Sequence, residues 1–256
     1  MRIWILTSEL PFEYAGGIAR YVGNYARALG TAGHEVVILA RGKTTGNEVR
    51  SPGVRIITFQ PRYERLHEPN PSGEPDAHPA YPYNVLSYWP ALSYQMAEEV
   101  LRLIEEVGPP EVIESQEYGA LPYYLLQRKL TERSPLRDIP VVVHLHTPSF
   151  ELARLNQEPR YRFPQYWVGQ MEKFCIVAAD AVLSPSQFLA ESIRRTLGSS
   201  PEITTIPYPY LMGEASCEIP SEPGHVVYVG RLELRKGCLL YTSDAADDLL
   251  CVDLGG

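Results

Sequence analysis

Short apolar segments alternate along this chain with longer segments whose apolar residues recur at helical spacing. The first kind is typical of buried strands, and the second of helices that bury one face. We predict strands over residues 2–7, 35–40, 54–59, 111–115, 141–145, 181–184 and 203–206. We predict helices over residues 18–29, 84–107, 118–130, 166–178 and 187–197, with a kink or restart at Pro90 and a cap at Ser186. This alternation predicts an α/β fold, a Rossmann-like, doubly wound parallel sheet with helices on both faces.

Two polar segments interrupt the alternation. Residues 61–83 are rich in Pro, with Gly, Asn, Asp and His, and predict a long irregular loop, which in a compact domain is commonly functional or disordered. Residues 209–224 have the composition of a linker, and a new strand follows at residues 225–230. We therefore expect a first domain over residues 1–208 and the start of a second domain over residues 225–237.

Composition excludes several classes of protein. The 256 residues carry a net charge of -8, which gives no long-range attraction toward nucleic acid. No apolar stretch reaches the length of about 18 residues that a membrane-spanning helix needs, and the N-terminal apolar part is too short for a signal peptide, so we expect a cytoplasmic protein. The four cysteines form no C-x-x-C pair, so no zinc site or disulfide framework is predicted, and Cys175 is expected in the core.

Ligands of open α/β sheets bind beyond the carboxyl ends of the strands. Gly16 and Gly17 lie between the first strand and the first helix, where backbone N–H groups can approach a phosphate or a sugar hydroxyl. A tight turn without a ligand explains the same two glycines equally well. In the second domain, Arg231 and Lys236 follow a strand and could clamp a diphosphate, although an exposed basic turn is the alternative.

Two further strands end in polar side chains. His144 and His146 fall on the same side of their strand, and His146 at its end is the better candidate for contact with a ligand. A metal site built from both histidines and Glu114 is a weaker alternative. Glu114, Gln116 and Glu117 end the neighbouring strand and could meet a sugar, or simply form a solvated turn.

Taken in order, these segments resemble glycosyltransferase family 4. The matching segments occur in the family's order and at its spacing, at residues 16–18, 33–37, 143–147, 179–186, 205–208, 229–232 and 236–237. The resemblance implies a GT-B fold, in which two Rossmann-like domains face each other across a cleft. It implies transfer of a sugar from a nucleotide sugar to an acceptor with retention of anomeric configuration, without a cofactor or a metal ion.

The resemblance also implies roles for individual residues. Gly16 and Gly17 match the family's glycine loop near the donor phosphates and the acceptor, and His146 matches the active-site histidine that contacts the transferred sugar. Arg231 and Lys236 match the basic pair that holds the diphosphate. The acceptor is a glycan, a lipid or a small molecule, and a lipid acceptor implies peripheral association with a membrane. Aromatic residues of the loop over 61–83 could shape the acceptor site or cover the core.

The family's donor-binding domain, with its E-x7-E motif, would continue far beyond Gly237. Residues 238–256 instead resemble the translated read-through of a sequencing adapter, as found at the ends of metagenomic reading frames, although a short acidic helix is the alternative. We therefore expect that this chain is inactive alone and that its full-length parent is the enzyme.

Two other functions compete with this one. The first is a non-catalytic module that binds carbohydrate or phosphate. The second is a different Rossmann-like, nucleotide-dependent enzyme such as an oxidoreductase. The missing G-x-G-x-x-G motif, and the presence of Ala40 and Arg41 where an acidic residue would end the second strand, argue against the second.

Overall fold

The computed structural model describes residues 1–11, 16–61, 87–131, 135–198, 202–210 and 233–236. Nearly all of the predicted loop over 61–83 lies outside the described residues, as do the predicted strand over 225–230, Arg231 and the tail over 238–256. None of the described helices is long and apolar enough to cross a membrane.

Eight strands of the described chain form one sheet in the order β3-β4-β2-β1-β5-β6-β7-β8. Their bounds are β1 Arg2–Thr7, β2 Glu35–Arg41, β3 Gly46–Ser51, β4 Val54–Phe59, β5 Val112–Gln116, β6 Val141–His144, β7 Ala181–Ser184 and β8 Ile203–Thr205. Every neighbouring pair is parallel except β3 and β4, which are antiparallel. The predicted α/β class is confirmed, and the expectation of a wholly parallel sheet is corrected to a mixed one.

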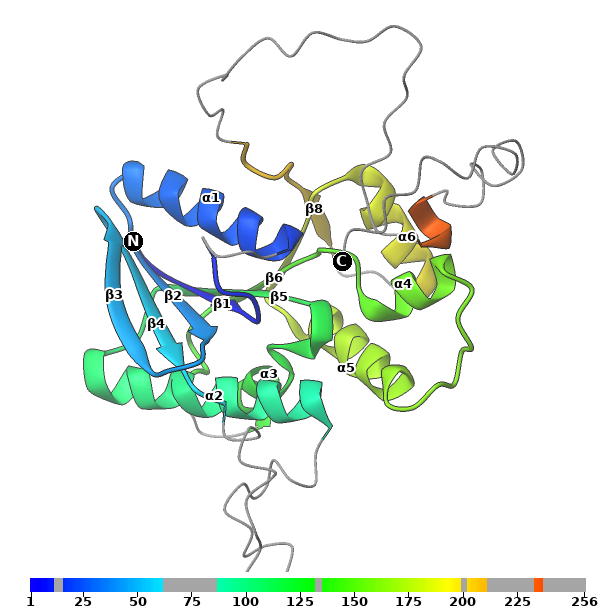
Figure 1. Ribbon diagram of the computed structural model, residues 1–256, viewed down its shortest axis with the longest axis horizontal. Helices are drawn as coiled ribbons and strands as arrows, with labels where there is room; N and C mark the ends of the chain where they lie inside the picture. Colours follow the sequence, from blue (N-terminus) through cyan, green and yellow to red (C-terminus); the bar gives the residue numbers. More distant parts are fainter. Residues whose placement is uncertain (12–15, 62–86, 132–134, 199–201, 211–232, 237–256) are drawn as a thin grey trace, which may run out of the picture.

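Helices cover both faces of the sheet (Figure 1). The α-helices are α1 Gly17–Thr31, α2 Tyr88–Val107, α3 Tyr123–Thr131, α4 Ser149–Leu155, α5 Gln165–Ala178 and α6 Gln187–Leu197, and short 3-10 turns occupy Tyr118–Ala120 (η4) and Leu234–Lys236 (η5). Strand β1 shows how the two layers arise, because alternate side chains point to opposite faces. Ile3 and Ile5 pack in the cluster that includes α1, whereas Trp4 and Leu6 pack in the cluster that includes α2 and α3.

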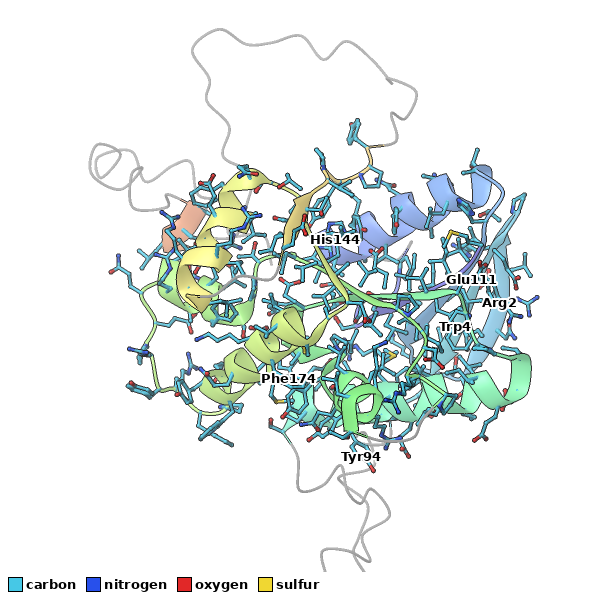
Figure 2. All side chains as sticks on the ribbon, turned by 180° about the vertical axis from the view of Figure 1, so that it is seen from behind. Arg2, Trp4, Tyr94, Glu111, His144 and Phe174 are labelled. Carbon is cyan, nitrogen blue, oxygen red and sulfur yellow. The ribbon has the colours of Figure 1, made fainter. Side chains whose placement is uncertain are left out.

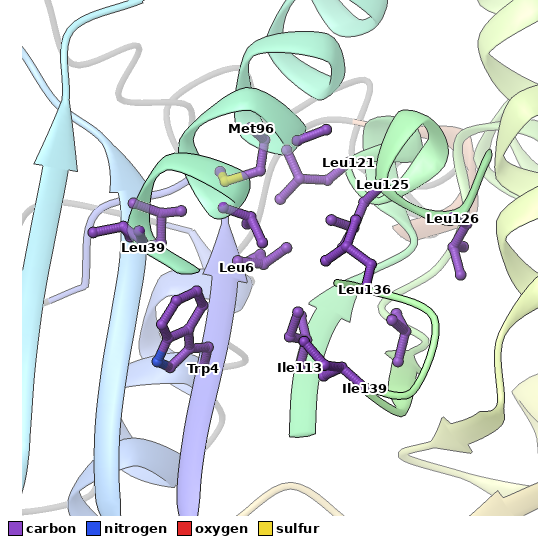
Figure 3. Packing of buried hydrophobic residues seen from close by; sticks show 14 of the residues in the cluster. Trp4, Leu6, Leu39, Met96, Ile113, Leu121, Leu125, Leu126, Leu136 and Ile139 are labelled. Carbon is purple, nitrogen blue, oxygen red and sulfur yellow. The ribbon is translucent and has the colours of Figure 1, made fainter. Parts of the chain in front are cut away.

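The larger core cluster lies between the sheet and α2, α3 and α5. Figure 3 shows Trp4, Leu6 and Leu39 of the sheet beside Met96 of α2 and Leu125 of α3. All of these side chains are at most 1% exposed. The predicted core position of Cys175, in α5, is confirmed, since its side chain is fully buried in the same cluster.

Two of the elements, β3 and α4, were not predicted from the sequence. Strand β3 has the sequence GNEVRS and is exposed along most of its length, because it pairs on one edge only and carries no apolar period. Helix α4 is a short element of seven residues in a polar connection, too brief to show a helical period. The predicted capping role of Ser186 is confirmed, since the backbone N–H of Leu189 donates to its Oγ at 3.2 Å.

The helix predicted over 118–130 is two elements, η4 and α3. Gly119 adopts a φ of 71°, which interrupts any continuous helix. A Cβ added there would lie 2.2 Å from the Trp89 ring, so the bend also depends on close packing. The helix predicted to restart at Pro90 begins at Tyr88, which places Pro90 in the first turn, where its missing N–H is not needed.

We predict that Gly119→Ala destabilises the fold far more than Gly198→Ala. Both glycines have positive φ, but a Cβ at Gly198 would meet nothing within 4 Å. The control variant should therefore lose only about 1 kcal/mol from backbone strain. Gly119→Ala should lose roughly a further 1–3 kcal/mol from the clash with Trp89. Equal losses in denaturant unfolding would show that the Trp89 contact does not constrain this turn.

Candidate functional site

The polar ends of β1, β5 and β6 meet at one edge of the sheet, because β5 pairs with β1 on one side and β6 on the other. The predicted residues Glu114 and Gln116 of β5 and His144 of β6 are therefore neighbours. Figure 2 shows His144 among the side chains between β6 and α1. Glu114, Gln116 and Glu117 are each less than 5% exposed, so all three face the protein interior.

Tyr21 of α1 was not identified as a site residue from the sequence. Its hydroxyl connects α1 to Glu114 of β5 and to His144 of β6. Its hydroxyl donates to Glu114 Oε1 at 2.7 Å and lies 2.7 Å from His144 Nδ1. A hydroxyl has one proton, so His144 must donate from Nδ1 to the Tyr21 oxygen. Burial, reinforced by the charge of Glu114, raises the pKa of Tyr21 far above its ordinary value and keeps the phenol protonated. His144 Nε2 is buried and has no hydrogen-bond partner in the described part of the chain.

His146 lies next to this buried group, just beyond the end of β6. Its ring stacks on His144 with centroids 5.4 Å apart and meets Tyr21 edge-on at 5.0 Å. The Tyr208 hydroxyl donates to the Leu145 carbonyl at 3.0 Å and hydrogen-bonds His146 Nδ1. Burial, with a smaller contribution from the charge of His144, lowers the pKa of His146 to about 3. His146 is therefore a neutral imidazole at pH 7, and with Nδ1 donating to Tyr208, its Nε2 is an acceptor.

A pair of buried carboxyl groups holds the backbone around His146. Both oxygens of Glu117 lie within 2.8 Å of the His146 amide nitrogen, which donates to them. Glu172 of α5 accepts from Gly119 N at 2.9 Å and from Ser149 Oγ at 2.7 Å. Both side chains are fully buried. The turn η4, the loop after β6 and helix α5 are therefore tied together by two acids, of which only Glu117 was singled out from the sequence.

The glycine loop is placed at the N-terminus of α1, as its position between strand and helix predicted. Gly16 is the N-cap residue of α1, and it has no side chain that could accept a hydrogen bond from the N–H groups of the first turn. The carboxylate of Glu9 takes this place and accepts from Ala19 N at 3.1 Å. A negative charge is favoured there by the exposed N–H groups and the helix dipole. The same N-terminus is therefore suited to an anion, and Glu9 occupies it in this structure.

The remaining predicted residues are less closely joined. Lys236 is exposed in η5, and its neighbour Arg235 donates its backbone N–H to Asn156 at the end of α4. Gln116 is engaged internally, since its Nε2 donates to Ser8 Oγ at 2.8 Å. Within the described chain, no three His, Cys, Asp or Glu side chains lie where they could hold a metal ion, so the alternative of a site at Glu114 and the two histidines is not assembled. Contact of Glu114, Gln116 and Glu117 with a sugar stays a prediction.

Tyr21→Phe should destabilise the fold, because it leaves the buried Glu114 carboxylate and His144 Nδ1 without the hydroxyl that they share. The expected loss is about 1–3 kcal/mol in the free energy of unfolding. Tyr161→Phe is the matched control, since the Tyr161 side chain is 70% exposed. A loss in Tyr21→Phe no larger than in the control would contradict the proposed hydrogen bonding of Tyr21.

Stability should fall between pH 6.5 and pH 8. Burial raises the pKa of Glu117 to about 8 and that of Glu172 to about 7, above the ordinary value of 4.5. The folded chain then retains protons that the unfolded chain has released, so this stabilisation is full below pH 4.5 and is lost as pH rises through the two raised values. The lowered pKa of His146 acts in the opposite direction, but its effect is complete above the ordinary value of 6.5.

The slope in this window should reach at most about 1.4 kcal/mol per pH unit for each carboxyl group. Denaturant unfolding at several pH values measures it. Glu117→Gln should reduce the slope, since glutamine keeps an acceptor for the His146 N–H but has no proton to release. Glu158→Gln, at an exposed position, should leave the slope unchanged. A free energy of unfolding that does not change with pH in this range in the wild-type chain would contradict the assignment of two raised carboxyl pKa values.

Comparison with solved structures supports the fold. The catalytic domain of starch synthase IV from Arabidopsis thaliana, bound to ADP and acarbose, has a TM-score of 0.50 and 13% identity, over 81% of this chain and 51% of that chain. A sucrose-phosphate synthase structure from Thermosynechococcus elongatus has a TM-score of 0.47 and 16% identity, over 84% of this chain and 91% of that chain. The expected Rossmann-like fold, that of one half of a GT-B glycosyltransferase, is confirmed.

Comparison of sequences identifies the family. Glycogen synthases from two strains of Mycobacterium tuberculosis are 24% identical to this chain over 258 residues, which are 93% of this chain and 56% of theirs. The chain thus spans about half the length of these curated relatives. A family model described as a glycosyl transferase 4-like domain matches residues 16–209, well over half of the chain. This chain therefore belongs to the glycosyl transferase 4-like family.

Proposed function

We propose that this chain is the acceptor-side half of a retaining glycosyltransferase, which moves a sugar from a nucleotide sugar to an acceptor. The observation that carries the proposal is the neutral His146 at the carboxyl edge of the sheet, with Nδ1 held by Tyr208 and its amide held by Glu117. Family membership and the ADP in the starch synthase structure support a nucleotide-sugar donor. The proposal includes a cytoplasmic location, and neither a metal ion nor a cofactor.

In this proposal, His146 offers Nε2 as a hydrogen-bond acceptor to a hydroxyl of the transferred sugar. A neutral imidazole suits this role, because an imidazolium could only donate. The hydrogen bond between Tyr208 and Nδ1 fixes the tautomer of His146, so the imidazole ring need not rearrange when the sugar binds. The Tyr21 hydroxyl keeps His144 in place beneath the ring. Tyr21 and His144 therefore act as positioning residues and His146 as the residue that contacts the sugar.

The donor diphosphate is proposed to lie near Gly16 and Gly17, with Arg231 and Lys236 on its other side. The N-terminus of α1 favours a negative charge, and two cations would neutralise the charge that develops on the leaving group. Glu9 now takes the N–H of Ala19, so the carboxylate must turn away before a phosphate can bind there. We propose that this exchange accompanies donor binding.

The test is a transfer assay on a longer protein in which residues 1–237 are followed by a donor-binding domain. We expect it to release a nucleoside diphosphate from one of a panel of ADP- and UDP-sugars, and to form a product with the donor's anomeric configuration. We expect this chain by itself to give no turnover. His146→Ala should lower kcat about a hundredfold or more.

Tyr161→Phe, which alters an exposed side chain, is the matched control and should leave kcat unchanged. Detection of the product anomer by NMR separates retention from inversion. Inversion would overturn the retaining assignment alone. Absence of transfer from every nucleotide sugar, with binding of a glycan intact, would favour a non-catalytic carbohydrate-binding module instead.

A further inference from the structure

A cavity of about 460 Å³ opens between α4, the start of α5 and the loop that joins them. Its volume lies in the range of small-molecule sites. Ser149 and Phe150, which follow closely after His146 in the sequence, form part of its wall. In Figure 1 the loop between α4 and α5 runs along the side of the molecule opposite β3. The wall of the cavity therefore starts three residues along the chain from His146.

The charge lining this cavity is positive, although the chain as a whole carries a net charge of -8. Four cations line it, against two carboxylates: Arg154, Arg160, Arg162 and Lys173 against Glu151 and Glu158. Both carboxylates are already engaged by two of the four cations. Arg154 binds both oxygens of Glu151, at 2.6 and 3.0 Å, and Arg162 lies 3.7 Å from Glu158.

Arg160 and Lys173 remain without a carboxylate partner in the described part of the chain. Lys173 is only half-exposed, and its ammonium lies 5.2 Å from the centroid of the Phe150 ring. An aromatic face attracts a cation but does not neutralise its charge. A partly desolvated cation without a counter-charge is costly, so this cavity favours an anionic guest. Gln165, Tyr166 and Gln170 add neutral hydrogen-bonding groups to the same wall.

We propose that this cavity is a subsite for a phosphate ester carried by the acceptor. That the guest is the acceptor of a sugar rests on the proposed transferase function. That the cavity binds a phosphate group rests only on its shape and its charged lining. Arg160 offers a planar fork that matches phosphate oxygens, and Lys173 offers a point charge from a second element. The volume accommodates a group of monosaccharide size beside the phosphate. The acceptor's hydroxyl would then point toward His146, which lies three residues before Ser149 of the cavity wall.

The test is a binding titration of the whole chain, without a donor, using glucose 6-phosphate as the probe and glucose as its uncharged counterpart. We expect glucose 6-phosphate to bind and glucose not to bind under the same conditions. Lys173→Gln and Arg160→Gln should each weaken binding about tenfold. Arg137→Gln, an exposed cation outside the cavity, should leave affinity unchanged. Added salt should weaken binding, because the cations are partly exposed.

A second arm identifies the source of the phosphate. Vesicles of phosphatidylcholine with and without phosphatidylglycerol present a lipid phosphate, and co-sedimentation measures binding. Binding of either probe that is lost in Lys173→Gln supports the subsite, and the probe bound tells a soluble ester from a lipid. Absence of binding to both probes, or binding that the two cavity variants leave unchanged, overturns it. Arg160→Gln alters an exposed side chain, so a folding defect at Lys173 would not obscure the result.

These outcomes separate the subsite from the proposed transferase function. The titration needs no donor and no turnover. If the longer protein transfers sugar while the cavity variants bind glucose 6-phosphate like the wild type, only the subsite fails. If the cavity binds phosphate esters but no nucleotide sugar is ever turned over, only the transferase function fails.

Discussion

The hydroxyl of Tyr21 is the interaction on which the candidate site most depends. It joins α1 to β5 and β6 through Glu114 and His144, residues that lie 93 and 123 positions along the chain from it. A carboxylate and an imidazole buried side by side in an apolar sheet would be costly without this shared partner. Because the hydroxyl has one proton and donates it to Glu114, His144 must donate from Nδ1 to the hydroxyl oxygen. The His144 ring, on which His146 stacks, is thereby held in place.

The backbone after β6 is held by a second set of contacts that works in the same way. Glu117 accepts the N–H of His146, and Glu172 accepts N–H and hydroxyl groups of η4 and of the start of α4. Burial raises the pKa of Glu117 to about 8 and that of Glu172 to about 7, so at neutral pH the two acids together carry less than two negative charges in the core. The loop that carries His146 is therefore held by hydrogen bonds to two buried carboxyl groups.

Much of the fold could be predicted from local pattern, because buried parallel strands such as β1 and β2 are continuous apolar runs. Strand β3 escaped prediction because an exposed edge strand needs no apolar residues, and α4 because so short a helix has no period. His146 and Glu117 stood out because they follow the carboxyl ends of strands, where ligands of open α/β sheets bind. Tyr21 did not, since helical spacing assigns it to the buried face but cannot show that its hydroxyl meets two strands far along the chain. Glu172 lies within α5 and carries no local signal that it is buried.

The central claim is that His146 is neutral because its surroundings bury it and fix its tautomer. The most direct measurement is a pH titration of the His146 imidazole nitrogens by NMR in the whole chain, assigned with His146→Gln. At neutral pH, we expect Nε2 of His146 to be unprotonated and Nδ1 to be protonated, and we expect the imidazole to titrate with a pKa near 3. Protonation of His146 near the ordinary pKa of 6.5 would contradict it.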